Sequence, residues 1–443
     1  MKDKQPNCLN SIIGNQHRRF IEGGHTCFDV FCLASSVCRL TLPDEPLCIW
    51  TQDKTFIAAA ILAAVYGGPR IIIPYAFSPQ ALDEARACVS FSKILSGAKD
   101  ALPADCTVIG PDNVKSDSPL VLSGFVSDTP RIWLFTGGST GKPKLWSKTA
   151  RNLFGEALLL AKTFAIGPND CILSSVPPQH IYGLLFSVLV PLVSGCTVIE
   201  PVFSFPHEIL SAARDMGATI MVSVPSQYHV LKSENLKRYN LRLAFSSAGM
   251  LPVSDAEYFY GRTGIAINDI YGSTETGGIA WKAAPIDRQM YHAFKGIDWK
   301  IRKGRLQLSS DFLSPELTRD QNGFFTTADR AEPCGSDRFI LHGRADSIVK
   351  VGGRRVDLSE VCDKIKTLSG VRDAVVFAIN VRTGRGSDIA ALVAGTADPS
   401  SVRAGLAKIC EPYAIPRHIK IVESIPVSQT GKYARAVIKK LFR

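Results

Sequence analysis

Residues 135–144 read Phe135-Thr136-Gly137-Gly138-Ser139-Thr140-Gly141-Lys142-Pro143-Lys144, a loop of glycines and hydroxyl residues with two lysines at its exit. The loop follows the apolar run 131–134, whose β-branched and aromatic residues predict the end of a strand. Three glycines allow the backbone to curl so that several N–H groups point at one centre. Such a nest binds anions, and phosphate above all. The loop therefore predicts a nucleotide-phosphate site.

Two other loop types share part of this pattern. A Walker loop needs a glycine five residues before Gly-Lys and a Ser or Thr after the lysine, but that glycine is absent here and Pro143 follows the lysine. Residues 137–141 do fit the Gly-x-Ser-x-Gly elbow of α/β-hydrolases, and Asp329 and His342 follow in that fold's order. An elbow requires a helix directly after Ser139, and Gly-Lys-Pro-Lys is a poor first turn. The α/β-hydrolase stays open as the remote alternative.

A second motif reads Asp269-Ile270-Tyr271-Gly272-Ser273-Thr274-Glu275. An aromatic face can stack on adenine, and an Asp two residues earlier can accept hydrogens from the adenine amino group. Thr274 and Glu275 supply oxygens for phosphate and Mg²⁺. Taken alone, the motif also fits an ordinary strand-to-helix connection with a carboxylate. Beside a phosphate loop it predicts the adenine and metal side of a nucleotide site.

Together the two motifs resemble those of the adenylate-forming enzymes: acyl- and aryl-CoA synthetases, nonribosomal adenylation domains and luciferases. The pattern in that family is approximately Thr-Ser-Gly-Ser/Thr-Thr-Gly-x-Pro-Lys, and Gly137 stands here where Ser is common. The resemblance runs from about residue 47 to residue 441, and it is thinnest in the first hundred residues. In this family the strip Ser246-Ser247-Ala248-Gly249 would lie flat against adenine, although an ordinary tight turn explains it equally well.

Two later motifs extend the resemblance. Residues 325–329 and 341–353 match the stretches that carry the ribose-binding Asp, here Asp329, and an Arg, here Arg344; a carboxylate that accepts both hydroxyls is a common way to recognise ribose. Ser347 stands at the domain hinge, where Asp or Lys is common. Serine can absorb a φ/ψ change, but it makes no charged contact, which puts the energetics of the hinge in question. Gly353 would let a narrow pantetheine arm pass close to the backbone.

The C-terminal motif is Ile425-Pro426-Val427-Ser428-Gln429-Thr430-Gly431-Lys432-Tyr433-Ala434-Arg435. A lysine near a C-terminus is ordinarily a solvated charge. In this context the resemblance implies that Lys432 reaches the active site during adenylation. There its ammonium would bridge the substrate carboxylate and the α-phosphate as pyrophosphate leaves.

The resemblance thus implies a set of functional residues. The catalytic residues would be Lys432, Thr274, Glu275 and His180, with Glu275 also holding the metal. The residues that bind ATP and AMP would be Thr136, Gly137, Gly138, Ser139, Thr140, Gly141, Lys144, Ser247, Ala248, Gly249, Asp269, Tyr271, Gly272, Asp329 and Arg344. The implied cofactors are ATP, Mg²⁺, and coenzyme A or phosphopantetheine.

His180 lies in Pro177-Pro178-Gln179-His180-Ile181-Tyr182-Gly183-Leu184, ahead of an apolar helix. A histidine in that position is ordinarily a satisfied core residue. The resemblance places it instead beside the carboxylate site or at the entrance of the pantetheine tunnel. Tyr182 and Leu184 would then help line the acyl pocket, together with residues 222–226. The stretch favours an aromatic or medium-sized acid, without identifying it.

Length and composition agree with this interpretation. A chain of 443 residues, with 46% hydrophobic and 21% charged residues, exceeds one core and has ordinary globular composition. Alternating helical and apolar segments, such as 55–66 and 70–73, predict α/β units. We expect a large N-terminal AMP-binding domain of layered α/β sheets over residues 1–346, and a small mobile α+β domain over 347–443. Without an apolar signal segment or bilayer-length run, the protein is expected to be cytoplasmic.

Charge and cysteines add little specificity. The net charge is +11, and residues 347–443 carry 17 Lys and Arg against 8 Asp and Glu. Without the aromatic-basic pattern of RNA-binding modules, we expect no nucleic-acid partner; the basic domain fits coenzyme A or an acidic acyl carrier protein, or is simply a solvated face. The chain has no Cys-x-x-Cys, so its 12 cysteines are expected to be reduced thiols rather than zinc ligands.

The implied activity is that of an acyl- or aryl-CoA ligase. A carboxylate attacks the α-phosphate of Mg·ATP to give acyl-AMP and pyrophosphate, and a thiol then displaces AMP to give a thioester. In between, the small domain would turn about Ser347. A ligase of a biosynthetic cluster that loads an acyl carrier protein is the alternative, because it would share every motif. A non-catalytic relative would have lost a catalytic residue, whereas Lys432, Glu275 and Asp329 are all present.

Overall fold

The computed structural model describes residues 17–97, 102–111, 113, 118–120, 126–136, 143–236, 239–351, 354–380, 387–427 and 433–442. The chain divides into two compact units. Unit 1 comprises Met1–Asp298 and Ser309–Arg319, and unit 2 comprises Trp299–Leu308 and Asp320–Arg443. Each unit has a hydrophobic core of its own. The predicted domain boundary after residue 346 therefore lies inside unit 2. That residues 347–443 form a mobile domain stays a prediction.

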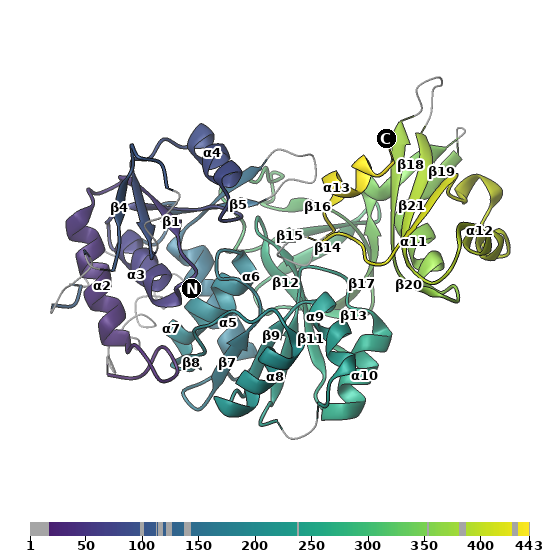
Figure 1. The fold of residues 1–443 in the computed structure, drawn as a ribbon. Coiled ribbons are helices and arrows are strands. Elements are labelled where there is room, and N and C mark those ends of the chain that lie inside the picture. Colours follow the sequence, from purple (N-terminus) through teal and green to yellow (C-terminus); the bar gives the residue numbers. More distant parts are fainter. Residues whose placement is uncertain are drawn as a thin grey trace. The chain divides into compact units, whose positions relative to one another are not determined.

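The first sheet of unit 1 has six strands in the order β4-β3-β1-β2-β5-β6 (Figure 1). Their bounds are β1 Pro46–Trp50, β2 Arg70–Ile73, β3 Lys93–Ser96, β4 Thr107–Ile109, β5 Ile132–Thr136 and β6 Lys144–Lys148. The neighbouring strands are parallel except β5 and β6, which form an antiparallel hairpin. Helices complete the α/β units: α2 Cys27–Leu40, α3 Lys54–Val65 and α4 Pro79–Cys88. α3 is buried on nearly every side, as its alanine- and isoleucine-rich sequence predicts.

Within unit 1, the strands of the second sheet run in the order β13-β12-β11-β10-β9-β7-β8. Its strands are β7 Cys171–Ser174, β8 Thr197–Val198, β9 Ile220–Ser223, β10 Leu243–Ser246, β11 Ile267–Ser273, β12 Gly277–Ala284 and β13 Met290–Ala293. The strands from β8 to β11 are parallel, whereas β11, β12 and β13 are antiparallel. Since parallel strands end at one edge, the residues that follow β7, β9 and β10 meet the end of β11 there. Ligands of open α/β sheets bind at such an edge.

Helices connect these strands (Figure 1). Their bounds are α5 Ala150–Thr163, α6 Ile181–Leu184, α7 Val190–Ser194, α8 Pro206–Asp215, α9 Pro225–Val230 and α10 Val253–Thr263, with a 3₁₀ turn at Leu231–Ser233. α6 and α7 are joined by a π-helical turn at Leu185–Leu189, so 181–194 form one buried helical segment. Gly195, in the left-handed region at φ +83°, ends this segment.

Unit 2 contains three groups of strands and a separate core. The strands are β14 Asp298–Arg302, β15 Arg305–Ser309, β16 Phe325–Pro333, β17 Arg338–Arg344, β18 Ile348–Val351, β19 Arg354–Asp357, β20 Val371–Asn380, β21 Ser387–Gly395 and β22 His418–Val422. The helices are α11 Leu358–Lys366, α12 Pro399–Ala407 and α13 Arg435–Lys440, with 3₁₀ turns at Ala345–Ser347 and Pro412–Ala414. β18 pairs with β19, and β20-β21-β22 form a sheet with one apolar face packed on α11 and α12 and the other on α13.

The predicted α/β class is confirmed, as are two elements expected from the sequence. The segment 55–66 is helix α3, and 70–73 is strand β2. Among the helices of the described ranges, none combines the length and the apolar character that a bilayer crossing requires. The cytoplasmic location stays a prediction.

Candidate active site

The edge of the second sheet brings together side chains from several strands. Ser223, Ser246 and Asp269 are register partners on β9, β10 and β11, so their side chains lie on the same face. Ser175 extends this row, because its Oγ lies 2.8 Å from the Ser223 Oγ. All except Ser175 are buried. The row places a buried carboxylate beside three hydroxyls at the predicted site.

Asp269 is held by two further groups that the sequence did not single out. The Tyr291 hydroxyl donates to its Oδ2 at 2.7 Å, and the Lys282 ammonium lies 3.5 Å from the same oxygen. The Lys282 Nζ also lies 4.7 Å from the centroid of the Tyr291 ring. Burial raises the pKa of Asp269, whereas Lys282 and Tyr291 act in the opposite direction. These partners fix the orientation of the carboxylate.

Tyr271 and the small-residue strip lie next to each other at the ends of β11 and β10. The Ser247 hydroxyl donates to the Ile270 carbonyl at 2.8 Å, directly before Tyr271. Ala248 adopts φ +70°, which is uncommon for a residue with a Cβ and marks a constrained backbone. Gly249 follows it and is exposed. The strip is thus a strained turn beside the candidate adenine-stacking residue.

The turn after β11 carries Thr274 and Glu275, both half-buried. It is closed by reciprocal bonds: the Ser273 N–H donates to the Thr276 Oγ1 at 3.1 Å, and the Thr276 N–H donates to the Ser273 Oγ at 3.3 Å. A Cβ at Gly272 would lie 2.4 Å from the Gly277 carbonyl oxygen, so glycine is required where the two arms approach. Thr274 and Glu275 therefore lie in a turn whose backbone is fixed by hydrogen bonds.

The predicted phosphate loop falls between β5 and β6 in the sequence. Thr136 and Lys144 are its last described strand partners, and the Thr136 hydroxyl lies 3.4 Å from the Lys144 carbonyl oxygen. Lys144 is exposed. The strand expected before the loop is confirmed as β5. The loop residues Gly137, Gly138, Ser139, Thr140 and Gly141 lie outside the described residues.

Two buried charges in unit 1 were not predicted. Lys148, the last residue of β6, is fully buried and donates to the Phe312 carbonyl at 2.9 Å. Glu156 of α5 is buried and accepts the Gly278 N–H at 2.6 Å. Burial lowers the pKa of Lys148 to about 8, against the opposing influence of Glu156 and Glu275. Burial also raises the pKa of Glu156. The opposite charges stabilise each other inside the unit.

His180 is the residue before α6 and is half-buried. Its neighbour Tyr182 donates to the Ser223 carbonyl at 3.2 Å, which ties α6 to the edge of the sheet. The Gln179 side chain is 1% exposed, and its amide nitrogen and oxygen have no hydrogen-bond partner among the described residues. A buried amide of this kind is costly unless a ligand or water satisfies it. Gln179 therefore joins His180 as a candidate contact of the acid.

The remaining predicted residues belong to unit 2. Asp329 and Arg344 face each other as partners on β16 and β17. Ser347 donates through its hydroxyl to the Asp357 Oδ1 at 2.8 Å, and Asp357 also pairs with Arg330. Lys432 and Gly353 lie outside the described residues.

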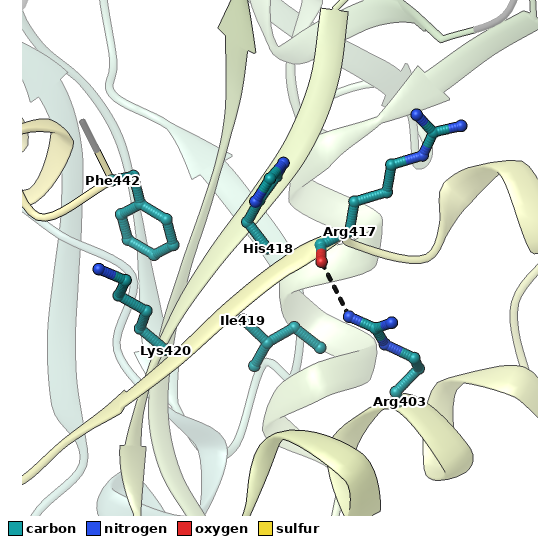
Figure 2. Close-up of a pocket in the computed structure, with 6 residues that line it drawn as sticks. All are labelled: Arg403, Arg417, His418, Ile419, Lys420 and Phe442. Carbon is teal, nitrogen blue, oxygen red and sulfur yellow. Dashed lines mark hydrogen bonds between the residues drawn. The ribbon is translucent and has the colours of Figure 1, made fainter.

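Unit 2 also carries a basic pocket of about 320 Å³ on its outer strand. Figure 2 shows the lining residues, which come from α12, from β22 and the residue before it, and from the C-terminal end: Arg403, Arg417, His418, Ile419, Lys420 and Phe442. The Arg403 guanidinium donates to the Arg417 carbonyl at 2.8 Å, and the Lys420 ammonium lies 5.4 Å from the Phe442 ring centroid. The pocket combines positive charge with one aromatic face.

Comparison with known proteins connects this geometry to a family. The model of the family described as AMP-binding enzyme matches residues 67–303, over half of the chain. A sulfoacetate–CoA ligase of Cupriavidus necator is 25% identical over 340 residues, covering 70% of this chain and 66% of that protein. A malonate–CoA ligase of Mus musculus is 23% identical over 513 residues, covering 95% and 87%.

Similarity in structure extends over both units. The crystal structure of ATP-bound MatB from Rhodopseudomonas palustris has a TM-score of 0.85 at 20% identity and covers 98% of each chain. The fold predicted from the motifs is confirmed. So is the predicted enzyme class, an AMP-forming acid–thiol ligase that uses ATP. This chain belongs to the AMP-binding enzymes, the superfamily of adenylate-forming ligases.

Proposed function

We propose that this protein activates a carboxylic acid by forming acyl-AMP at the edge of the second sheet, and then transfers the acyl group to a pantetheine thiol. The observation that carries the proposal is the assembly at one sheet edge of Tyr271, the strip after β10 and the Thr274–Glu275 turn. An aromatic face, a flat backbone and phosphate-binding oxygens in one place are what an adenylate requires.

We assign the adenosine contacts to residues of the sequence motifs. Tyr271 would stack on adenine while Ala248 and Gly249 lie against its other side. Asp269 would accept hydrogens from the amino group, since its Oδ2 is oriented by Tyr291 and Lys282. Asp329 would accept the ribose hydroxyls, with Arg344 opposite it on the neighbouring strand.

The triphosphate would lie between the phosphate loop and the turn after β11. Backbone N–H groups of residues 137–141, with Thr136 and Lys144, would bind its oxygens. Thr274 and Glu275 would hold the phosphate and Mg²⁺; a half-buried carboxylate is a hard oxygen ligand that fits this ion. Mg²⁺, when bound, neutralises charge on the phosphates.

Adenylation then consists of positioning and charge stabilisation. A carboxylate oxygen bonds to the α-phosphorus, the bond to the bridging oxygen breaks, and pyrophosphate carries the electron pair away. We assign to Lys432 the stabilisation of charge on the carboxylate and the α-phosphate in this step. His180 and Gln179 would border the acid, because both precede α6 at the sheet edge.

Transfer requires the thiol to reach the acyl carbon. We propose that residues 347–443 turn about Ser347, withdrawing Lys432 and bringing Gly353 to the pantetheine arm. The sulfur bonds to the acyl carbon, the bond to the AMP oxygen breaks, and the thiol proton passes to solvent. Ser347 is suited to hold one end state, since its hydroxyl donates to Asp357.

The thiol acceptor is coenzyme A or the phosphopantetheine of an acyl carrier protein. The basic pocket of Figure 2 favours a negatively charged acceptor, because Arg403, Arg417 and Lys420 all contribute to its lining. An acidic carrier protein is the second candidate, and this exposed basic surface is the observation that favours it. Rates with coenzyme A and with holo-carrier protein distinguish the two.

For the acid, the names of the two relatives point to small acids with a second acidic group, while the residues around α6 favour an aromatic or medium-sized acid. The test is ATP–pyrophosphate exchange over a panel with small dianionic, aliphatic and aryl acids. We expect exchange with one class, and none with Lys432→Ala. Exchange with no acid, together with no binding of ATP by calorimetry, would refute the proposed function.

A further inference from the structure

We infer that Glu156 and Lys148 are positioning residues, which hold the Thr274–Glu275 turn in the geometry that the phosphates and the metal require. This inference rests on the proposed role of Glu275. Neither residue belongs to a predicted motif, and neither would touch substrate. They act through the backbone on both sides of the turn.

Glu156 supports the far end of the turn. Its Oε1 accepts the Gly278 N–H at 2.6 Å, three residues after Glu275. This short bond joins the middle of α5 to the first residues of β12, 122 positions away in sequence. A hydrogen bond to a carboxylate is stronger than one between neutral groups, especially when both partners are buried.

Gly277 and Gly278 lie in close contact with the Glu156 carboxylate. A Cβ at Gly277 would lie 2.7 Å from the Glu156 Oε2, and Gly277 also adopts φ +68°. A Cβ at Gly278 would lie 3.2 Å from the Oε1. The backbone therefore contacts the side chain directly, and a shift of Glu156 must move the turn or break the contact.

Lys148 supports the near side through the segment 309–319. Its ammonium donates to the Phe312 carbonyl at 2.9 Å, and two residues later the Ser314 N–H donates to the Glu275 carbonyl at 2.8 Å. The same segment is tied to β6 by Glu316, whose Oε1 accepts the Ser147 N–H at 3.1 Å. The backbone of the proposed metal ligand thus connects to the strand that follows the phosphate loop.

The arrangement links the two phosphate-binding elements through buried groups. β6 follows the loop in the sequence and ends at Lys148. Glu156 lies in α5, the helix that comes next in the chain. Positioning groups behind metal ligands typically change affinity or activity about 10–100-fold when removed. A purely structural pair would instead lower stability and leave the response to magnesium unchanged.

The test compares two substitutions at one site. Glu156→Gln keeps an acceptor for the Gly278 N–H, whereas Glu156→Met fills a similar volume without one. We expect Glu156→Gln to retain kcat within about 3-fold, and Glu156→Met to lose about 10–100-fold in pyrophosphate exchange with a raised half-saturating magnesium concentration. In hydrogen exchange without ligands, the amides of 273–278 should exchange faster in Glu156→Met. Its affinity for AMP without magnesium should match wild type.

Asp170→Asn is the matched control. Asp170 is also buried in unit 1, but it pairs with Arg242 at 2.6 Å, and we assign it no role at the site. We expect lower thermal stability and an unchanged magnesium dependence. A folded Glu156→Met with wild-type kcat, magnesium dependence and exchange at 273–278 would overturn the inference. Inactive wild-type protein would instead count against the proposed function.

A second pair of variants applies if Glu156→Met does not fold. Gly277→Ala introduces a methyl group 2.7 Å from the Glu156 Oε2, which should raise the half-saturating magnesium concentration. Glu156→Asp shortens the side chain and relieves only the part of the clash that this carboxylate makes, because the methyl group would still lie 2.8 Å from the Phe312 Cβ and residue 277 would keep its positive φ. We expect the double variant to bind Mg·ATP more tightly than Gly277→Ala alone. Additive losses in the double variant would contradict a direct contact between the turn and Glu156.

Discussion

The Tyr291 hydroxyl donates to the Asp269 Oδ2 at 2.7 Å, within the second sheet of unit 1. Asp269 is buried, and the Lys282 ammonium also lies 3.5 Å from its Oδ2. The pair couples the candidate adenine-binding carboxylate to β13, a strand that contains no predicted site residue. A substitution at Tyr291 is therefore expected to act on Asp269.

Tyr291→Phe should weaken ATP binding in a pH-dependent manner. The lost O–H donor stabilises the ionised carboxylate, so the pKa of Asp269, already raised by burial, should rise further. We expect the KM for ATP to increase about 3–10-fold near neutral pH, and its increase toward acid to begin at a higher pH than in wild type. Steady-state kinetics between pH 5.5 and 8.5 measure this. If the pH dependence of the KM for ATP is unchanged in Tyr291→Phe, Asp269 does not contribute to adenine recognition.

Lys432→Ala should slow adenylation without slowing thioester formation. Because Lys432 is assigned to charge stabilisation during adenylation, pyrophosphate exchange should fall by about 100-fold or more. Thioester formation from supplied acyl-AMP should stay near the wild-type rate. Rapid-quench measurements of each half-reaction report this directly, and equal losses in both would refute the assignment.

Ser347→Pro should have the opposite effect and slow thioester formation without slowing adenylation. Proline fixes φ near −65°, so residue 347 would no longer absorb the change that a rotation demands. We expect near-wild-type exchange and slower transfer to the thiol. Ser347→Ala is the matched variant, since it removes only the hydroxyl that donates to Asp357. If Ser347→Pro transfers at the normal rate, the hinge lies elsewhere.

Charge reversal in the basic pocket tests whether the pocket binds an acidic carrier protein. With Arg417→Glu and Lys420→Glu combined, the KM for a holo-acyl carrier protein should rise about 10-fold, because the surface would repel an acidic partner. Pyrophosphate exchange should not change. An unchanged KM for the carrier protein would assign the pocket to a solvated surface.

Asp170→Asn should lower the stability of unit 1 above about pH 4. Burial opposes its charge, but Arg242, Gly167 and Thr219 hold the pKa of Asp170 below its usual range. A carboxyl with a depressed pKa stabilises the fold above its unfolded pKa and loses that contribution as pH falls. We expect a loss of about 2 kcal/mol at pH 7 that shrinks toward pH 3. Urea unfolding at both pH values tests it.

The sequence predicted those parts of the site that are local in the chain. The strand before the phosphate loop, the turn after β11 and the helix after His180 each depend on a few adjacent residues. Turn glycines, hydroxyls and β-branched runs carry that information directly.

The buried support could not be predicted in the same way. Glu156 and Gly278 are 122 residues apart, and a glutamate in an amphipathic helix is ordinarily exposed. Lys148 resembles any lysine at the end of a strand. Only the tertiary structure reveals that both charges are enclosed: α5 packs against β12 around Glu156, and Lys148 donates to the Phe312 carbonyl.

The most direct test of the central claim follows oxygen from the acid. The acid that supports exchange is labelled with ¹⁸O in its carboxylate, and the products of thioester synthesis are analysed by mass spectrometry. Acyl-adenylate formation predicts one labelled oxygen in AMP for each thioester formed. Label in inorganic phosphate or pyrophosphate, with none in AMP, would contradict the account.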